Sequence, residues 1–182
     1  NGVDYTINAA VGVPYTTGDP DDNKDRPVNN TLPAWDLLAG AYGAFALLAA
    51  ERQRRITGTG SEIRLALSDV AIGSLGHLGQ IAEAITKGDR AKSGNSLFGA
   101  FGRDFLTADG QRVMIVAITR RQWAGLISAL EITREIATLE KSLGLSFARD
   151  EGLRFAHRDQ IYPVVEKAVA RFSLAQIGQL LD

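Results

Sequence analysis

The stretch 32-LPAWDLLAGAYGAFALLAAERQRR-55 contains the longest uncharged apolar run of the chain, from Leu37 to Ala50. Within this run apolar or small residues recur every three or four positions, which is the spacing of one face of a helix. Arginines at 52, 54 and 55, followed by Gly58, provide the cationic last turn and the glycine that commonly end a helix. The stretch therefore predicts one long helix that begins at about Leu37, directly after Asp36.

Composition limits the classes of protein to which the chain can belong. Its 182 residues are 45% hydrophobic, enough for one or two packed domains, and 20 Lys+Arg against 21 Asp+Glu give a net charge of -1. This balance argues against binding to nucleic acid or to an acidic membrane surface. The apolar run is shorter than the ~20 residues of a membrane span, so we expect a buried helix. A cytoplasmic location is the default expectation. The absence of cysteine excludes disulfides and thiol chemistry.

The chain opens on Asn-Gly-Val-Asp without a methionine, which suggests a piece of a longer protein. The segments outside the long helix predict two domains. Residues 17–27 are rich in turn formers and charge and predict a surface loop. Residues 61–67 alternate polar and apolar, which predicts a strand, and Ser68 then caps a predicted helix that runs to about Thr86. Residues 87–96 are polar and punctuated by glycine. We therefore expect domains at 1–86 and 97–182, joined by this linker.

The second half predicts a small α+β domain. Asp109-Gly110 lies between two strand-like runs, a good hairpin signal. Thr119 with Gln122, and Ser173 with Gln176, match the capping box at which helices begin. Further helices are expected at 134–143 and 158–171, and Trp123 is expected in the core. His77 and His157 lack the spacing of a metal site, so we expect both to be structural or exposed.

Asp36 is the one acidic residue between positions 32 and 50. An aspartate directly before an apolar helix usually serves as its N-cap and contributes about 1 kcal/mol. The same position also suits an anionic nucleophile, because free backbone N–H groups and the positive end of the helix favour a carboxylate. The pattern alone leaves both roles open.

Two other groups of residues are candidates for ligand contact. The segment 98-FGAFG-102 could line an acyl pocket through Gly99 and Phe101, although a plain edge strand fits equally well. The arginines at 52, 54 and 55 could contact phosphates, although a solvated helix end is the more common role.

Several motifs occur in the order found in one enzyme family. They are PAWD (33–36), AGA (39–41), LLAAER (47–52), TGTG (57–60), SEI (61–63) and LSD (67–69). In these motifs, and in 4–18 and 105–123, the chain resembles class III coenzyme A transferases and their relatives, the α-methylacyl-CoA racemases. The resemblance implies a helix-rich α/β fold, formed by the later part of the family's large domain and its small domain, the latter incomplete. It also implies a homodimer, and little activity for this chain alone.

The resemblance implies that Asp36 is the catalytic nucleophile. In the family this carboxylate attacks an acyl-CoA thioester to give a mixed anhydride, and the CoA thiolate returns to form an aspartyl-CoA thioester. An acceptor carboxylate then reverses the sequence. The implied partners are an acyl-CoA and a small carboxylic acid. The CoA thioester is a substrate, and neither a tightly bound cofactor nor a metal is expected.

Departures from the family patterns narrow the activity. The racemases use a His and a Glu at positions that fall on Val3 and Thr119, and neither side chain does acid–base work at neutral pH. The glycine loop at 94–102 is shorter than that of formyl-CoA transferases. Residues 4–6, 32–36, 94–95 and 116–121 resemble mesaconyl-CoA C1–C4 CoA transferases, also called 2-methylfumaryl-CoA isomerases. Intermolecular CoA transfer, racemisation and a non-catalytic α-rich interaction domain, in which Asp36 is only a cap, remain alternatives.

Overall fold

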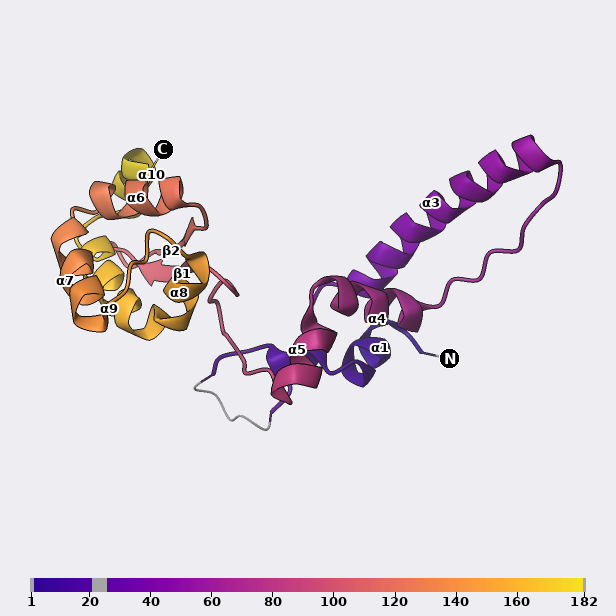
Figure 1. The fold of residues 1–182 in the computed structure, drawn as a ribbon, viewed down its shortest axis with the longest axis horizontal. Helices are drawn as coiled ribbons and strands as arrows, with labels where there is room; N and C mark the ends of the chain where they lie inside the picture. Colours follow the sequence, from indigo (N-terminus) through magenta and orange to yellow (C-terminus); the bar gives the residue numbers. More distant parts are fainter. Residues whose placement is uncertain (1, 21–25, 182) are drawn as a thin grey trace. The chain divides into compact units, whose positions relative to one another are not determined.

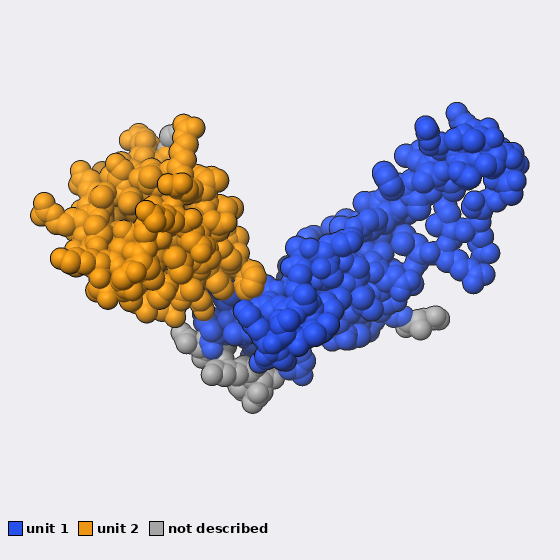
Figure 2. Space-filling model, in the orientation of Figure 1, with its two compact units in different colours: residues 1–94 blue, residues 95–182 orange. Residues whose placement is uncertain are grey.

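The computed structural model describes residues 2–20 and 26–181 and divides the chain into two compact units (Figures 1 and 2). Unit 1 comprises residues 1–94 and unit 2 comprises residues 95–182. The division falls inside the segment 87–96. Of the predicted surface loop at 17–27, residues 21–25 lie outside the described residues. The predicted helix-rich α/β fold is confirmed.

Every regular element among the described residues of unit 1 is a helix. Its elements are α1 (Asp4–Ala10), α2 (Val13–Thr16), α3 (Ala34–Thr57), α4 (Leu67–His77) and α5 (Gln80–Lys87). The small helices α1 and α4 both contact α3 near its beginning (Figure 1). A compact cluster holds them together through the buried side chains of Trp35, Ala71 and Leu75, with partly buried neighbours on α1 and α2. The beginning of α3 is therefore the packed end of this helix.

The long helix α3 ends as predicted but begins earlier. It starts at Ala34, with Pro33 as the N-cap residue, so Asp36 lies inside the helix and not before it. Gly58 ends it in the left-handed conformation, with φ of 74° and an N–H that donates to the Arg54 carbonyl at 2.8 Å. Large apolar side chains are exposed along the helix. They include Leu37, Phe45, Leu47, Leu48 and Ile56.

Two predictions for the segment after α3 are wrong. Residues 61–66 form no strand, because no partner strand pairs with them among the described residues. They run back along α3 (Figure 1), and a Cβ added at Gly43 would lie 3.6 Å from a side-chain methyl group of Leu65. The predicted helix from Ser68 to Thr86 is two helices. Gly79 adopts φ of 75° and separates α4 from α5, and α4 begins at Leu67 with Ala66, not Ser68, as its cap residue.

Unit 2 begins with the predicted hairpin. Strands β1 (Phe101–Leu106) and β2 (Arg112–Ala117) pair antiparallel, with Phe101 opposite Ala117 and Phe105 opposite Val113. Asp109-Gly110 forms the turn, with φ of 73° at Gly110. The alternation of the strands places one face of the hairpin in the core of the unit.

Five helices follow among the described residues of unit 2. They are α6 (Arg120–Ala129), α7 (Thr133–Leu143), α8 (Glu151–Ala156), α9 (Arg158–Val169) and α10 (Leu174–Leu181). Of these, α6, α8 and α9 contact the strands, while α7 and α10 pack on other helices. The capping boxes of Thr119 with Gln122 and of Ser173 with Gln176 are both present. Trp123 is 1% exposed and lies in the core, as predicted. Within the described residues, no helix combines the length and apolar character needed to cross a bilayer.

Candidate active site

Asp36 is the third residue of α3 and stands in its first turn with an exposed side chain. Negative charge is favoured there by the helix dipole. No hydrogen bond or ion pair engages its carboxylate within residues 2–20 and 26–181. The predicted nucleophile is therefore an exposed carboxylate, without a hydrogen bond or ion pair to the described residues, at the start of a 24-residue helix.

The cap of α3 comes from another helix. Oδ2 of Asp4, in the first turn of α1, accepts the backbone N–H groups of Trp35 at 2.7 Å and Asp36 at 3.1 Å. The other free N–H groups of the first turn are also satisfied, because Ala34 donates to the Leu32 carbonyl at 2.8 Å and Leu37 to the Pro33 carbonyl at 3.2 Å. The interpretation of Asp36 as a helix cap is therefore wrong.

A second side chain of α1 binds the same turn. Oδ1 of Asn8 accepts the indole N–H of Trp35 at 3.2 Å, and its Nδ2 donates to Oδ1 of Asn29 at 2.7 Å. Asp4 and Asn8 are each 4% exposed. Their spacing of four residues places both on one face of α1, so that α1 holds α3 through one bond to an indole and two to the backbone.

The sequence carries only a weak sign of this contact. Residues 3–13 are mostly small and apolar, and Asp4 and Asn8 are the polar pair in that segment with helical i, i+4 spacing. The spacing puts both side chains on one face of a short helix, but polar side chains in such a pattern usually face solvent, so their burial could not be predicted from it. The partner, more than 25 residues away, could not be identified from spacing.

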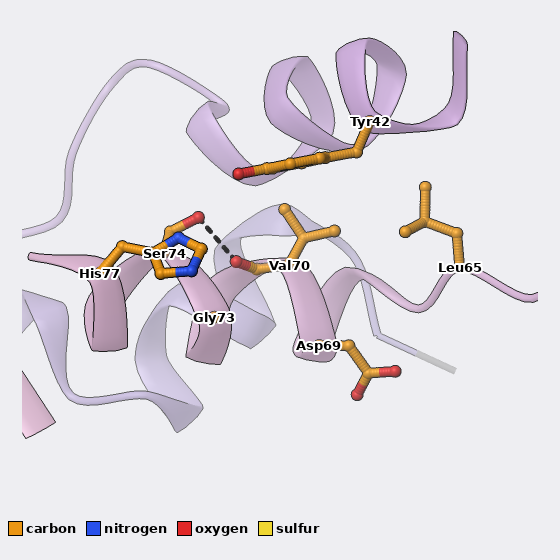
Figure 3. Close-up of a pocket in the computed structure, with 7 residues that line it drawn as sticks. All are labelled: Tyr42, Leu65, Asp69, Val70, Gly73, Ser74 and His77. Atoms are coloured by element: carbon orange, nitrogen blue, oxygen red, sulfur yellow. Dashed lines mark hydrogen bonds between the residues drawn. The ribbon is translucent and has the colours of Figure 1, made fainter. Parts of the chain in front are cut away.

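A small pocket of about 230 Å³ lies between α3, the extended segment and α4 (Figure 3). Tyr42 of α3 reaches across α4 toward Ser74 and His77, while Leu65 and Asp69 lie toward the other end. The Ser74 hydroxyl donates to the carbonyl of Val70 at 2.7 Å. The pocket is smaller than the ~300 Å³ at which ligand sites begin, and Asp36 is not among its lining residues.

The candidate acyl-pocket residues lie in unit 2. Gly99 stands in a turn before β1 with φ of 79° and open space at its Cβ position. The Phe101 ring is fully buried and packs 5.2 Å from Trp123 and 5.7 Å from Tyr162, measured between ring centroids. Phe98, at 49% exposed, is the aromatic side chain of this segment that reaches the surface. Substrate contact by Gly99 and Phe101 stays a prediction.

The arginines at the end of α3 engage a carboxylate of their own helix. Nε of Arg54 and Nε of Arg55 each lie 2.8 Å from a carboxylate oxygen of Glu51. The hydrogen bonds from Arg54 and then from Arg55 lower the pKa of Glu51. These ion pairs agree with the interpretation of the arginines as a solvated helix end.

No group of three or more His, Asp or Glu that could hold a metal occurs in the part of the chain that the structure describes.

Comparison with known proteins identifies the sequence at the level of a family. The protein-family model described as CoA-transferase family III matches residues 1–182 of the sequence. The 2-methylfumaryl-CoA isomerase of Chloroflexus aurantiacus is 45% identical over 181 residues, which are 99% of this chain and 44% of that protein. The chain thus spans less than half the length of this curated relative.

Solved structures show the same fold at lower identity. A CaiB/BaiF family protein from Brucella suis superposes with a TM-score of 0.66 at 23% identity, covering 98% of this chain and 45% of the other. Rv3272 from Mycobacterium tuberculosis, in its orthorhombic form, gives a TM-score of 0.73 at 23% identity, covering 99% and 43%. At this identity the two structures support the fold alone.

Proposed function

This chain belongs to CoA-transferase family III, and from that premise we propose that the full-length protein transfers coenzyme A between carboxyl groups with Asp36 as the nucleophile. The observation that carries the proposal is the state of Asp36. Its side chain is exposed in the first turn of α3 and has no bonding partner among the described residues, while Asp4 serves as the cap. A carboxylate that the fold does not need is available for chemistry.

The proposed reaction proceeds in two exchanges at the Asp36 carboxylate. It attacks the thioester carbonyl, the carbon–sulfur bond breaks, and a mixed anhydride and CoA thiolate result. The thiolate then attacks the aspartyl carbonyl, which releases the substrate's carboxylate and leaves an aspartyl-CoA thioester. Attack by the acceptor carboxylate on this thioester forms a second anhydride, and the returning thiolate yields the new acyl-CoA and free Asp36.

The proposed substrate is a dicarboxylic acid that carries CoA on one of its two carboxyl groups. The support is the 45% identity to a protein named 2-methylfumaryl-CoA isomerase. In an intramolecular transfer the acceptor is the second carboxylate of the same acid, so the product is an isomer of the substrate. For mesaconyl-CoA, the thioester of 2-methylfumarate, this is transfer between C1 and C4, with the cytoplasm as the proposed location.

The anhydride and thioester intermediates must be kept from water, because hydrolysis would discard the thioester's energy. Asp36 is exposed in this chain, so the proposal requires covering surfaces from outside the described residues. Apolar side chains on α3 are also exposed, such as Phe45 at 75% and Leu48 at 69%, and exposed apolar surface of this kind marks a contact with another protein surface. We propose that the rest of the full-length chain and a second copy in a homodimer provide both.

The racemase alternative lacks its acid–base pair. Val3 is an exposed apolar side chain, and the Thr119 hydroxyl is used in the capping box of α6. Neither accepts a proton at neutral pH. The alternative of an interaction domain rested on Asp36 as a cap, and the cap is Asp4.

Mass spectrometry of the full-length protein tests the proposed nucleophile. Incubated with mesaconyl-CoA, the wild type should carry a covalent CoA adduct on the peptide that contains Asp36. The Asp36→Ala variant should carry none and should lose CoA transfer while remaining folded. Retained turnover in that variant would exclude Asp36 as the nucleophile.

A further inference from the structure

We propose that Asp4 is a positioning residue for the Asp36 nucleophile. Its carboxylate fixes the backbone from which the Asp36 side chain projects and thereby sets the place of the reacting oxygens. This inference rests on the proposed function of Asp36 and adds to it a second acidic residue with a different task.

The contact is made directly at the residue that it positions. One oxygen of Asp4, Oδ2, accepts the N–H of Asp36 at 3.1 Å and the N–H of the preceding Trp35 at 2.7 Å. The nitrogen of Asp36 is covalently bonded to the Cα that carries the reacting side chain. Two consecutive bonds to one fixed oxygen therefore restrain both translation and rotation of that Cα.

Burial makes this restraint firm. Asp4 is 4% exposed, so water cannot easily take the place of its carboxylate at the two N–H groups. A buried carboxylate is itself stabilised only while such donors satisfy it. Asp4 and the first turn of α3 are thus each dependent on the other.

Asp36 has no comparable restraint on its own side chain. Within the described residues no group bonds its carboxylate, so the precision of the nucleophile depends on the backbone turn that carries it. A nucleophile displaced by about 1 Å can lose about 100-fold in rate, because attack needs a near-ideal approach to the carbonyl. Loss of the Asp4 bonds should therefore slow the covalent step more than substrate binding.

Asn8 provides a matched control for simple docking of α1 on α3. It lies one turn after Asp4, is equally buried, and contacts the Trp35 indole but not the backbone of Asp36. If Asp4 only helps to dock the two helices, Asn8→Ala should slow the reaction as much as Asp4→Ala. If Asp4 positions Asp36, the two variants should differ.

The test follows the rate at which the CoA adduct forms on the Asp36 peptide of the full-length protein, by rapid quench and mass spectrometry with mesaconyl-CoA. We expect Asp4→Ala to slow this step by about tenfold or more with KM changed by less than about threefold. Asn8→Ala should stay within about threefold of the wild-type rate. Amide exchange of the peptide 33–38 should be faster in Asp4→Ala than in Asn8→Ala.

A second variant keeps the test valid if Asp4→Ala does not fold. Asp4→Asn retains an oxygen that can accept both N–H groups, and it should recover part of the rate lost in Asp4→Ala. Equal adduct rates in the wild type, Asp4→Asn and any folded Asp4→Ala protein would overturn the positioning role. A wild type that forms no adduct at all would instead overturn the proposed function, and the positioning role with it. Faster exchange at 33–38 would then identify Asp4 as a cap only.

Discussion

The backbone N–H of Asp36 donates to Oδ2 of Asp4 at 3.1 Å, so the carboxylate that caps α3 and the carboxylate in its first turn belong to different residues. The free energy of unfolding should therefore depend on Asp4 more than on Asp36. We expect Asp4→Ala to lower the free energy of unfolding by about 1–2 kcal/mol, the usual loss for a helix cap. Asp36→Ala should change it by less than about 0.5 kcal/mol, as for an exposed side chain without a partner.

Denaturant unfolding of the two full-length variants beside the wild type measures this difference. The interaction-domain alternative predicts the opposite order, with a loss of about 1 kcal/mol for Asp36→Ala. Such a result would mean that the Asp36 side chain, and not Asp4, satisfies the first turn of α3.

Features that depend on near neighbours in the sequence could be predicted. The hairpin turn at Asp109-Gly110 and the capping box of Thr119 with Gln122 are encoded within four or five residues, and both are present. The end of α3 at Gly58 belongs to the same class. The chemistry of these turns is complete within the segment itself.

Features that depend on distant partners could not be predicted. The alternation at 61–67 fits a strand, but a strand needs a second strand to bond, and the described residues provide none. The cap of α3 lies on Asp4, in a different helix, where spacing near Asp36 cannot reveal it. The break at Gly79 lies between these two classes of feature, because the sequence shows a glycine at this position but does not show that it adopts the left-handed conformation.

The β2–α6 junction of unit 2 is held by a buried arginine. The guanidinium of Arg154, fully buried, donates to the carbonyls of Ile118 and Phe147, the latter at 2.5 Å. Arg154→Met would fill a similar volume but leave both carbonyls without a donor, which should cost about 3 kcal/mol in unfolding free energy. Denaturant unfolding checks this, with the exposed Arg149→Met as a control that should change by less than about 0.5 kcal/mol. Equal losses of unfolding free energy in the two variants would exclude the buried hydrogen bonds of Arg154 as the cause of its effect.

Acid should destabilise unit 2 through Asp104. The hydrogen bond from Asn95 Nδ2, at 3.0 Å, is the main cause that lowers the pKa of Asp104 below its usual 3.8, and Arg112 across the hairpin adds to it against the opposing effect of burial. Because the folded pKa is the lower one, this stabilisation is present above about pH 3.8 and is lost as pH falls through the folded pKa.

Unfolding midpoints measured between pH 7 and pH 2.5 check this dependence. The Asp104→Asn variant should be less stable than the wild type at pH 7, by up to about 1 kcal/mol, and the difference should shrink in acid. Asp159→Asn, which removes a carboxylate whose side chain is 81% exposed, is the matched control for the loss of one charge. A difference that stays constant down to pH 2.5 would show that the Asp104 charge is not responsible.

Proton exchange beside the thioester should be absent, since the two positions that correspond to the acid–base pair of the racemases hold Val3 and Thr119. Val3 is 65% exposed and apolar, and the Thr119 hydroxyl accepts the Gln122 N–H at 3.2 Å. In D₂O, the full-length protein given a CoA thioester of a saturated 2-methyl acid should therefore incorporate no deuterium at C2 above the buffer rate, even where the CoA adduct on Asp36 forms. Asp36→Ala should abolish the adduct and leave the exchange at that same background. Deuterium incorporated as fast as the adduct forms would place the protein with the racemases, and a base outside Val3 and Thr119 would then have to be found.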